Sequence, residues 1–172
     1  MPVHIIQGDI TQCETDAIVT AANSGLIGGG GVDGAVHRAA GPLLLKECSL
    51  LGGCRTGDAK ITGGYRLKAK YVIHAVGPVY SERREEECAA LLAGCYEKSL
   101  ELAKAHGLAS VAFPLISAGT YGYPIDKALS IAVKTLTRSC GGLEVLIVLF
   151  NKDAAETARK LFPDLWEVAS GS

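Results

Sequence analysis

The chain has 172 residues, which is enough for one compact domain with a sizeable core but not comfortably enough for two. Hydrophobic residues make up 48% and charged residues 20%, as in ordinary soluble globular proteins. The formal net charge is -1, whereas a dedicated duplex-DNA binder normally carries a strong basic excess. We therefore expect a monomer with one domain over residues 1–172, a core at about 3–168, and no nucleic-acid partner.

The expected elements alternate between strands and helices. Short apolar, β-branched runs between turn residues predict strands, and apolar residues every three or four positions predict helices. In chain order these are strands at Val3–Gln7 and Asp16–Thr20, helices at Gly34–Ala40 and Pro42–Leu51, strands at Asp58–Thr62 and Tyr71–Val76, a helix at Glu85–His106, a strand at Ser110–Leu115, a helix at Ile125–Ser139, a strand at Glu144–Phe150, a helix at Ala154–Leu161 and an edge strand at Asp164–Val168. The alternation predicts an α/β domain whose mixed, largely parallel sheet is covered on both faces.

The start of the chain and its six cysteines point to an intracellular location. The sequence Met-Pro-Val-His enters an apolar run at once, without the features of a secretory signal or a transmembrane span. The cysteines form no C-x-x-C pair, so buried, reduced thiols are favoured over a metal site, which the spacing alone does not exclude. We expect a cytoplasmic protein with free thiols and no membrane contact.

A glycine-rich segment, Gly28–Gly34, is the strongest functional signal. Gly29-x-Gly31-x-x-Gly34 matches the dinucleotide fingerprint only formally, because the loop starts late after its strand and a helix follows it. No Gly-Lys-Ser/Thr is present, so a Walker loop is excluded as well. Backbone N–H groups at a helix start still favour an anion such as phosphate over a purely structural turn. Asp33 would repel phosphate, which suggests that it acts in chemistry beside the phosphate.

Other polar segments follow the remaining predicted strands. Ile116–Pro124 is a second glycine-containing loop with two tyrosines at its rim, and it precedes a helix. Ligands bind beyond the carboxyl ends of parallel strands, so Ala21–Gly34, Ile116–Pro124 and Asn151 are expected to converge on one crevice. Two further residues remain ambiguous on their own. Asp9 is a turn or capping residue as readily as a ligand, and Phe150 is more typical of a core position.

These segments together resemble the macrodomain family, and specifically its MacroD-type branch. The resemblance runs from about Val3 to Phe162. It is carried, in order, by Gly8-Asp9-Ile10-Thr11, Ala21-Ala22-Asn23, Gly28–Gly41, Thr56-Gly57-Asp58-Ala59, His74-Ala75-Val76-Gly77-Pro78 and Ile116–Pro124. It implies a three-layer α/β/α fold that binds ADP-ribose. It also implies an ADP-ribosyl ester hydrolase, which deacetylates O-acetyl-ADP-ribose and removes mono-ADP-ribose from Asp and Glu side chains of proteins.

The resemblance also implies a role for each site residue. Asp9 and the Ile10 backbone would bind the adenine, Phe150 would lie against its face, and Asn151 would lie near the adenosine ribose. The diphosphate would be held by the Gly28–Val32 backbone, with Gly30, Gly31 and Val32, and by the second loop, with Ser117, Ala118, Gly119, Thr120 and Tyr121. Ala22 would also contact the ligand. Asn23 would bind the distal ribose, Asp33 would orient a water there, and Tyr121 would close over it. No cofactor and no metal are implied.

Several alternatives and one departure accompany this interpretation. Asn151 stands where relatives commonly have Asp, which removes a charge at the ribose edge. A non-catalytic ADP-ribose reader shares most of the site, although Asn23 together with Asp33 favours the enzyme. A poly(A) or RNA binder is disfavoured by the charge balance. His37, four residues after Asp33, and His74, in a predicted strand, are expected to be structural.

Overall fold

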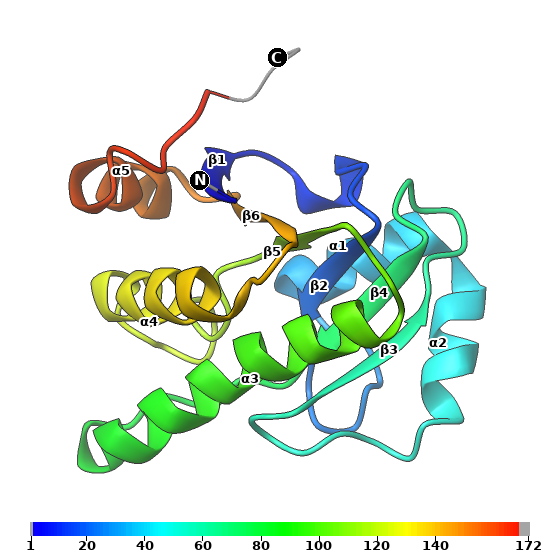
Figure 1. The fold of residues 1–172 in the computed structure, drawn as a ribbon. Helices are drawn as coiled ribbons and strands as arrows, with labels where there is room; N and C mark the ends of the chain where they lie inside the picture. Colours follow the sequence, from blue (N-terminus) through cyan, green and yellow to red (C-terminus); the bar gives the residue numbers. More distant parts are fainter. Residues whose placement is uncertain (1, 169–172) are drawn as a thin grey trace.

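The computed structural model describes residues 2–168 and shows an α/β domain (Figure 1). Its elements within that range, in chain order, are β1 (Val3–Gln7), η1 (Ile10–Gln12), β2 (Ala17–Ala21), α1 (Gly31–Ala40), α2 (Pro42–Ser49), β3 (Ala59–Gly63), β4 (Tyr71–Ala75), η2 (Glu82–Arg84), α3 (Glu85–Ala105), β5 (Ser110–Phe113), α4 (Ile125–Ser139), β6 (Glu144–Leu149) and α5 (Lys152–Leu161). The alternation predicted from the sequence is therefore confirmed. Among the described residues, no helix is long and apolar enough to cross a membrane.

The six strands form one mixed sheet in the order β1-β6-β5-β2-β4-β3. All neighbouring pairs are parallel except β3 with β4, which are antiparallel. In a parallel sheet the carboxyl ends of the strands share one edge, so the segments that follow β1, β2, β4, β5 and β6 emerge side by side. The sheet thus brings the loops singled out in the sequence to one edge of the molecule.

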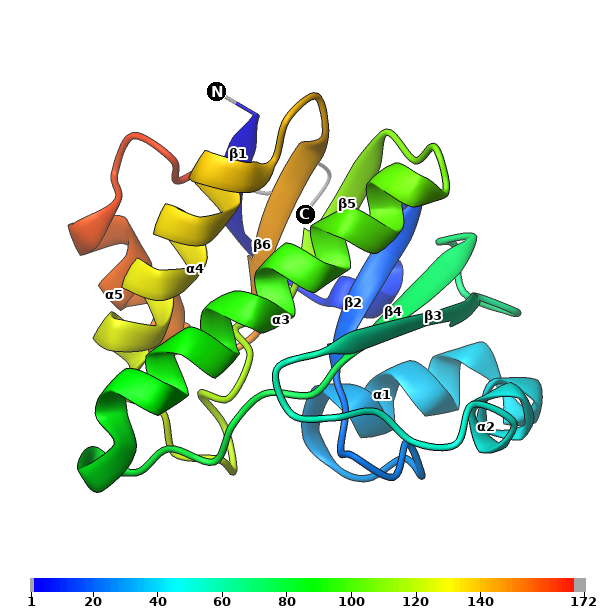
Figure 2. The ribbon, with the colours of Figure 1, turned by 60° about the horizontal axis from the view of Figure 1, so that its bottom comes forward.

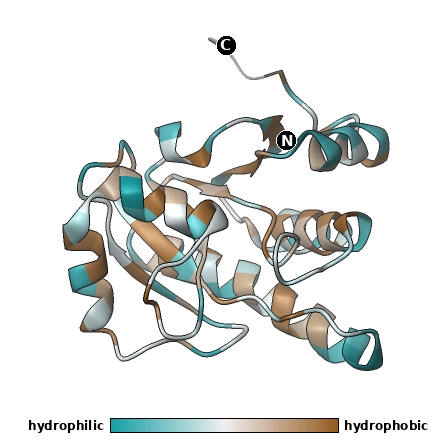
Figure 3. Cartoon of the chain, turned by 180° about the vertical axis from the view of Figure 1, so that it is seen from behind, coloured by the Kyte–Doolittle hydropathy of each residue, from teal (hydrophilic) through white to brown (hydrophobic). Residues whose placement is uncertain are grey.

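Helices cover both faces of the sheet (Figure 2). Alternate residues of each strand point to opposite faces, and two hydrophobic clusters follow this alternation. Val19 and Ile73 pack with residues of α3, α4 and α5, whereas Ile18 and Val72 pack with residues of α1 and α2. The strands are predominantly hydrophobic and the helices carry both kinds of residue (Figure 3). The result is the expected three-layer α/β/α arrangement.

Two of the predicted elements differ from the structure in a way that matters. The first helix was expected from Gly34 but begins at Gly31, so Asp33 lies in its first turn. The expected edge strand at Asp164–Val168 is wrong as a strand: only an isolated bridge joins Trp166 to Ile5, through the bonds Ile5 N–H to Leu165 O and Glu167 N–H to Ile5 O. A turn over residues 163–165 precedes this bridge, which limits the pairing with β1.

Candidate active site

The glycine loop, residues 22–30, joins β2 to α1 and is held by Asn23. The Asn23 amide donates through Nδ2 to the Gly28 carbonyl (2.7 Å), and its Oδ1 accepts from the Ile27 N–H (3.2 Å). Leu26 anchors the middle of the loop in the core, with 2% of its surface exposed. The Asn23 side chain therefore fixes the loop, and the second Nδ2 hydrogen remains for another acceptor.

The glycines at the start of α1 have different physical roles. A Cβ on Gly34 would lie 2.4 Å from the Gly29 carbonyl oxygen, so the helix and the loop can approach only because Gly34 has no side chain. A Cβ on Gly30 or Gly31 would meet nothing within 4 Å, and both residues are exposed. The first amides of α1 have no partner within the helix and carry the positive end of its dipole. This open, positive helix start suits an anionic group.

Asp33 points from the first turn of α1 towards the sheet. Thr20 Oγ1 donates to Asp33 Oδ1 at 3.0 Å, and His37 Nε2 lies 3.7 Å from the same oxygen. Burial raises the pKa of the Asp33 carboxyl, while the Thr20 hydrogen bond and His37 oppose that shift. Asp33 Oδ2 makes no hydrogen bond to a described residue. Every fully buried side-chain oxygen or nitrogen in residues 2–168 has a hydrogen-bond partner, so Oδ2 is not fully buried. Oδ2 therefore keeps contact with solvent.

The second loop, residues 114–124, joins β5 to α4 around a strained serine. Ser117 is buried and has φ +68, a left-handed conformation that non-glycine residues rarely adopt. Its hydroxyl donates to the Pro78 carbonyl (2.8 Å), and its own carbonyl accepts from the Tyr123 N–H (2.9 Å). Beyond Ser117, the residues Gly119 and Thr120 are exposed. These hydrogen bonds keep Ser117 in its strained conformation and so position a short exposed stretch of backbone at the sheet edge.

A third segment, residues 76–81 after β4, fastens the second loop. Tyr80 N–H donates to the Tyr121 carbonyl (2.9 Å), beside the bond from Ser117 to Pro78. A Cβ on Gly77 would lie 2.2 Å from Ser117 Oγ, so only glycine permits this contact. His74–Pro78 supported the family resemblance, but the sequence analysis gave this segment no role in the site. The pair Gly77-Pro78 at a strand end is nevertheless typical of a turn.

The opposite end of the edge carries an acidic and an aromatic side chain. Asp9 caps η1 by accepting the Thr11 N–H (2.9 Å) and hydroxyl (2.7 Å) with Oδ1. Gly8 N–H donates to the Leu149 carbonyl (3.0 Å), which brings the end of β1 beside Phe150 and Asn151. Phe150 is 77% exposed, so the core interpretation weighed for it in isolation is wrong. It follows the last residue of β6 and points away from the packed layers.

Comparison with known proteins identifies the family. The Macro domain family matches residues 19–132 of this chain. The chain belongs to the macrodomain family. This macrodomain is 52% identical over 164 residues to a Macro domain-containing protein of Methanosarcina mazei, covering 92% of the chain and 86% of that protein. It is also 57% identical over 134 residues to the Mus musculus ADP-ribose glycohydrolase MACROD2, covering 78% of the chain and 28% of that longer protein, which supports the MacroD-type branch.

Solved macrodomains share the fold closely. A variant of the Oceanobacillus iheyensis macrodomain with ADPR superposes with a TM-score of 0.87 at 40% identity, covering 94% of this chain and 91% of that one. The Trypanosoma brucei macrodomain in complex with ADP-ribose gives a TM-score of 0.83 at 43% identity, covering 92% and 68%. The fold expected from the resemblance is therefore confirmed.

The macrodomain edge brings the expected site residues together in two groups. The glycine loop and second loop follow the adjacent strands β2 and β5, while Asp9, Ile10, Phe150 and Asn151 follow the adjacent strands β1 and β6. Ile10 is buried in the core, with 4% of its surface exposed, so its side chain is not available to a ligand. Sequence reasoning missed Thr20, which holds Asp33; its place as the last residue of the predicted strand Asp16–Thr20 gave no sign of this.

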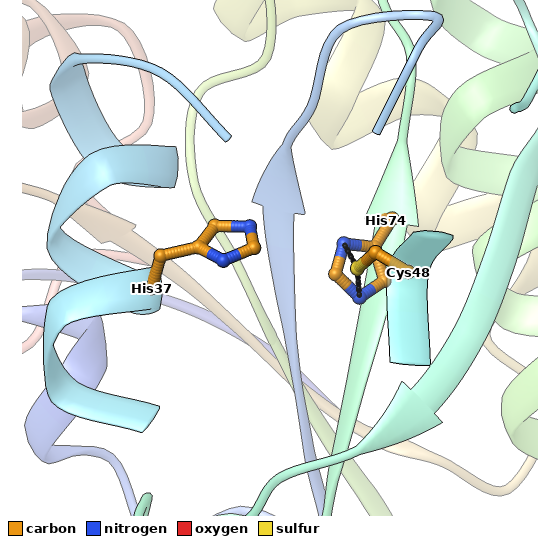
Figure 4. A group of neighbouring side chains, drawn as sticks. All are labelled: His37, Cys48 and His74. Atoms are coloured by element: carbon orange, nitrogen blue, oxygen red, sulfur yellow. Dashed lines mark hydrogen bonds between the residues drawn. The ribbon is translucent and has the colours of Figure 1, made fainter. Parts of the chain in front are cut away.

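A polar cluster lies beneath the glycine loop on the α1–α2 face of the macrodomain sheet (Figure 4). It comprises His37 of α1, Cys48 of α2 and His74 of β4, and it adjoins Asp33 through His37. His74 is 1% exposed, and burial together with His37 lowers its pKa to about 4. Thr62 Oγ1 lies 2.9 Å from His74 Nε2. His74 is thus the hydrogen-bonded core histidine that was expected.

Proposed function

We propose that this macrodomain binds ADP-ribose and hydrolyses esters at its distal ribose. Relatives named ADP-ribose glycohydrolases, MACROD1 and MACROD2, match most of the chain at 55–57% identity. Macrodomains of the same fold have been solved with ADPR and ADP-ribose. The substrate classes are O-acetyl-ADP-ribose and proteins carrying mono-ADP-ribose on Asp or Glu side chains. Six free cysteines support a protein that acts in the reducing cytoplasm, and a site built from one chain supports a monomer.

The arrangement of the sheet edge supports one binding orientation. Asp9 and Phe150 lie at the β1–β6 end, where an exposed ring and a carboxylate fit an adenine. The start of α1 and the exposed backbone after Ser117 lie at the β2–β5 centre, where N–H groups fit a diphosphate. Asn23 and Tyr121 then flank the distal ribose. Ala22, Gly30, Gly31, Val32, Ala118, Gly119 and Thr120 line the diphosphate, and Asn151 and the Ile10 backbone line the adenosine.

The observation that carries the hydrolase is the state of Asp33. One carboxylate oxygen is fixed by Thr20, and the other keeps contact with solvent at the base of the glycine loop. A carboxylate held in this way can orient a water, or accept its proton, as that water attacks the ester carbon. The leaving group is then the ribose hydroxyl, which takes a proton as the acid is released. General-base assistance of this kind contributes about 10²–10⁴-fold to the rate.

The decisive experiment separates turnover from binding in Asp33→Asn. Asparagine keeps the shape and the Thr20 hydrogen bond but cannot accept the proton of the water. We expect hydrolysis of O-acetyl-ADP-ribose to fall about 10²–10⁴-fold, while calorimetry gives an ADP-ribose affinity within about threefold of the wild type. Asp153→Asn, at an exposed position of α5, is the matched control and should change neither quantity.

Two other outcomes would change the conclusion. Tight ADP-ribose binding without turnover of either substrate by the wild type would make the protein a reader domain. Wild-type turnover by Asp33→Asn would leave the hydrolase in place but remove Asp33 from its chemistry. Binding of poly(A) that weakens steeply with added salt would instead support the RNA alternative.

A further inference from the structure

Three metal-binding side chains gather at a place that the proposed hydrolysis does not use. His37, Cys48 and His74 come from α1, α2 and β4, and one ligand atom of each lies within 4.8 Å of the others. Cys48 and His74 are each 1% exposed, and the side chain of His37 is 15% exposed. Residues this polar are seldom gathered in a hydrophobic layer without a partner that uses them. In Figure 4 the His37 ring extends from α1 towards the other two side chains.

The donor set has the chemistry of a thiophilic divalent ion. Two imidazoles and one thiolate suit Zn²⁺, whereas Mg²⁺ and Ca²⁺ require oxygen ligands. Tetrahedral zinc with ordinary bond lengths places a sulfur and a nitrogen ligand about 3.5 Å apart. Cys48 Sγ lies 4.0 Å from His74 Nδ1, and the three ligand atoms lie within 4.8 Å of one another, so each pair must close by up to about 1.3 Å around an ion.

The surroundings of His74 also fit a ligand. Metal-binding histidines usually hold one ring nitrogen in a hydrogen bond while the other meets the ion. Thr62 Oγ1 occupies Nε2 at 2.9 Å, which leaves Nδ1 for an ion, while Cys48 Sγ lies nearly equidistant from the two ring nitrogens.

We propose that His37, Cys48 and His74 form a Zn²⁺ site that ties α1, α2 and β4 together beneath the glycine loop. The ion is structural in this proposal and takes no part in the attack of water. The Cys48 thiol lies against the His74 ring, 3.8 Å from Nε2 and 4.0 Å from Nδ1. Binding turns the two side chains towards a shared centre and forms a zinc–sulfur bond in place of the S–H bond. One proton leaves to solvent.

The test uses Co²⁺ as a spectroscopic probe for the same site. The full-length protein is stripped with chelator, titrated with Co²⁺ and then with Zn²⁺. We expect a thiolate-to-cobalt charge-transfer band and visible bands of tetrahedral cobalt, complete at one equivalent and removed by Zn²⁺. Elemental analysis after gel filtration should find one zinc per chain. The melting temperature should rise on addition of Zn²⁺, since an ion that binds only the folded state stabilises it.

Matched variants make the result specific. Cys48→Ser should abolish the charge-transfer band, whereas Cys140→Ser, which changes another buried thiol at the end of α4, should keep it. If Cys48→Ser does not fold, His37→Asn at the most exposed ligand replaces it and should lose the tetrahedral bands. The proposal is overturned if no band appears at one equivalent, or if the band survives in Cys48→Ser. This outcome is independent of ADP-ribose turnover.

Discussion

Phe150 is an exposed aromatic side chain at the proposed adenine end of the sheet edge. An aromatic ring that is 77% exposed contributes little to the packing of the fold, but its face is available for stacking. Its neighbour Asn151 makes no side-chain cap to α5, so the amide also remains available to a ligand. The two residues follow the buried strand β6, which fixes where they stand. The exposure of Phe150 therefore fits the proposed adenine site.

Phe150→Ala should therefore weaken ADP-ribose binding without destabilising the protein. Stacking of a base on an aromatic ring is worth about 1–3 kcal/mol, which corresponds to roughly a 5- to 150-fold loss of affinity in calorimetry. The melting temperature should stay within about 1 °C of the wild type, because a surface substitution of this kind changes stability little. An unchanged affinity would remove Phe150 from the adenine site.

His74 should make stability depend on pH in the acidic range. Its pKa is about 4 in the folded protein against 6.5 normally, so between these values the unfolded chain binds the extra proton. His74 costs the folded state nothing above pH 6.5. As the pH falls towards 4, the free energy of unfolding decreases by about 3 kcal/mol in total because of this group. Urea unfolding of chelator-treated wild type and His74→Gln at pH 7 and 4.5 isolates the effect, because only the wild type should lose this contribution.

The comparison of wild type with His74→Gln matters because the raised pKa of Asp33 changes stability with pH in the opposite direction. Burial raises the pKa of its carboxyl, so folding favours the protonated acid and this group adds stability as the pH falls. Asp33 is present in both proteins, and its contribution largely cancels in the difference. Equal loss of stability in the wild type and in His74→Gln would contradict the assignment to His74.

At the scale of elements, the start of α1 contains one glycine that has no room for a side chain, Gly34, and one that has room, Gly30. Gly34 faces the Gly29 carbonyl across the helix turn, while Gly30 precedes the helix with φ −96 and open space around it. The helix can begin at Gly31 because the loop folds back against Gly34. Helix propensity alone would favour the later start expected from the sequence, since glycine is a poor helix former.

Gly34→Ala should accordingly destabilise the protein, and Gly30→Ala should not. A Cβ at 2.4 Å from a backbone oxygen forces the loop or the helix to move, at a cost of about 1–3 kcal/mol. At Gly30 the added methyl meets nothing within 4 Å, so the free energy of unfolding should stay within about 0.5 kcal/mol of the wild type. Denaturant unfolding monitored by circular dichroism measures both. Equal stability of the two variants would mean that the turn relaxes without cost.

At the scale of the whole molecule, the sheet buries its centre on both sides. β6, β5, β2 and β4 lie between other strands, and helices cover both faces. The functional loops all leave one edge, while a hollow of about 360 Å³ between α3 and α4 is lined by paired charges such as Arg138 and Glu97. No second copy is needed to complete the proposed site, because every residue assigned to it comes from one chain.

Light scattering coupled to size exclusion should therefore give a single species near 17.9 kDa. The same mass is expected with saturating ADP-ribose, because the ligand is proposed to bind within one chain. A mass near twice this value that persists on dilution would contradict the monomer. The exposed apolar residues Leu43 and Leu50 near α2 would then be the first positions to substitute.

The sequence by itself determined the order of the elements and the loops that bear the site. Apolar periodicity and glycine or proline at element ends are local properties, so Ile125–Ser139 was predicted with its observed bounds. The resemblance added the family and the named residues. The weaker predictions lay where local preference competes with long-range contacts, as at Gly31 and at the segment after Pro163, where only a bridge to β1 forms.

Only the tertiary structure decided how the side chains of the site are oriented. The Ser117 hydroxyl reaches the Pro78 carbonyl across 39 residues of sequence, and Cys48 approaches His74 across 26. The burial of one Asp33 oxygen and the exposure of Phe150 likewise depend on which elements pack around them. Such contacts follow from the order of strands in the sheet, because that order sets which chain segments become neighbours. No pattern along the chain encodes them locally.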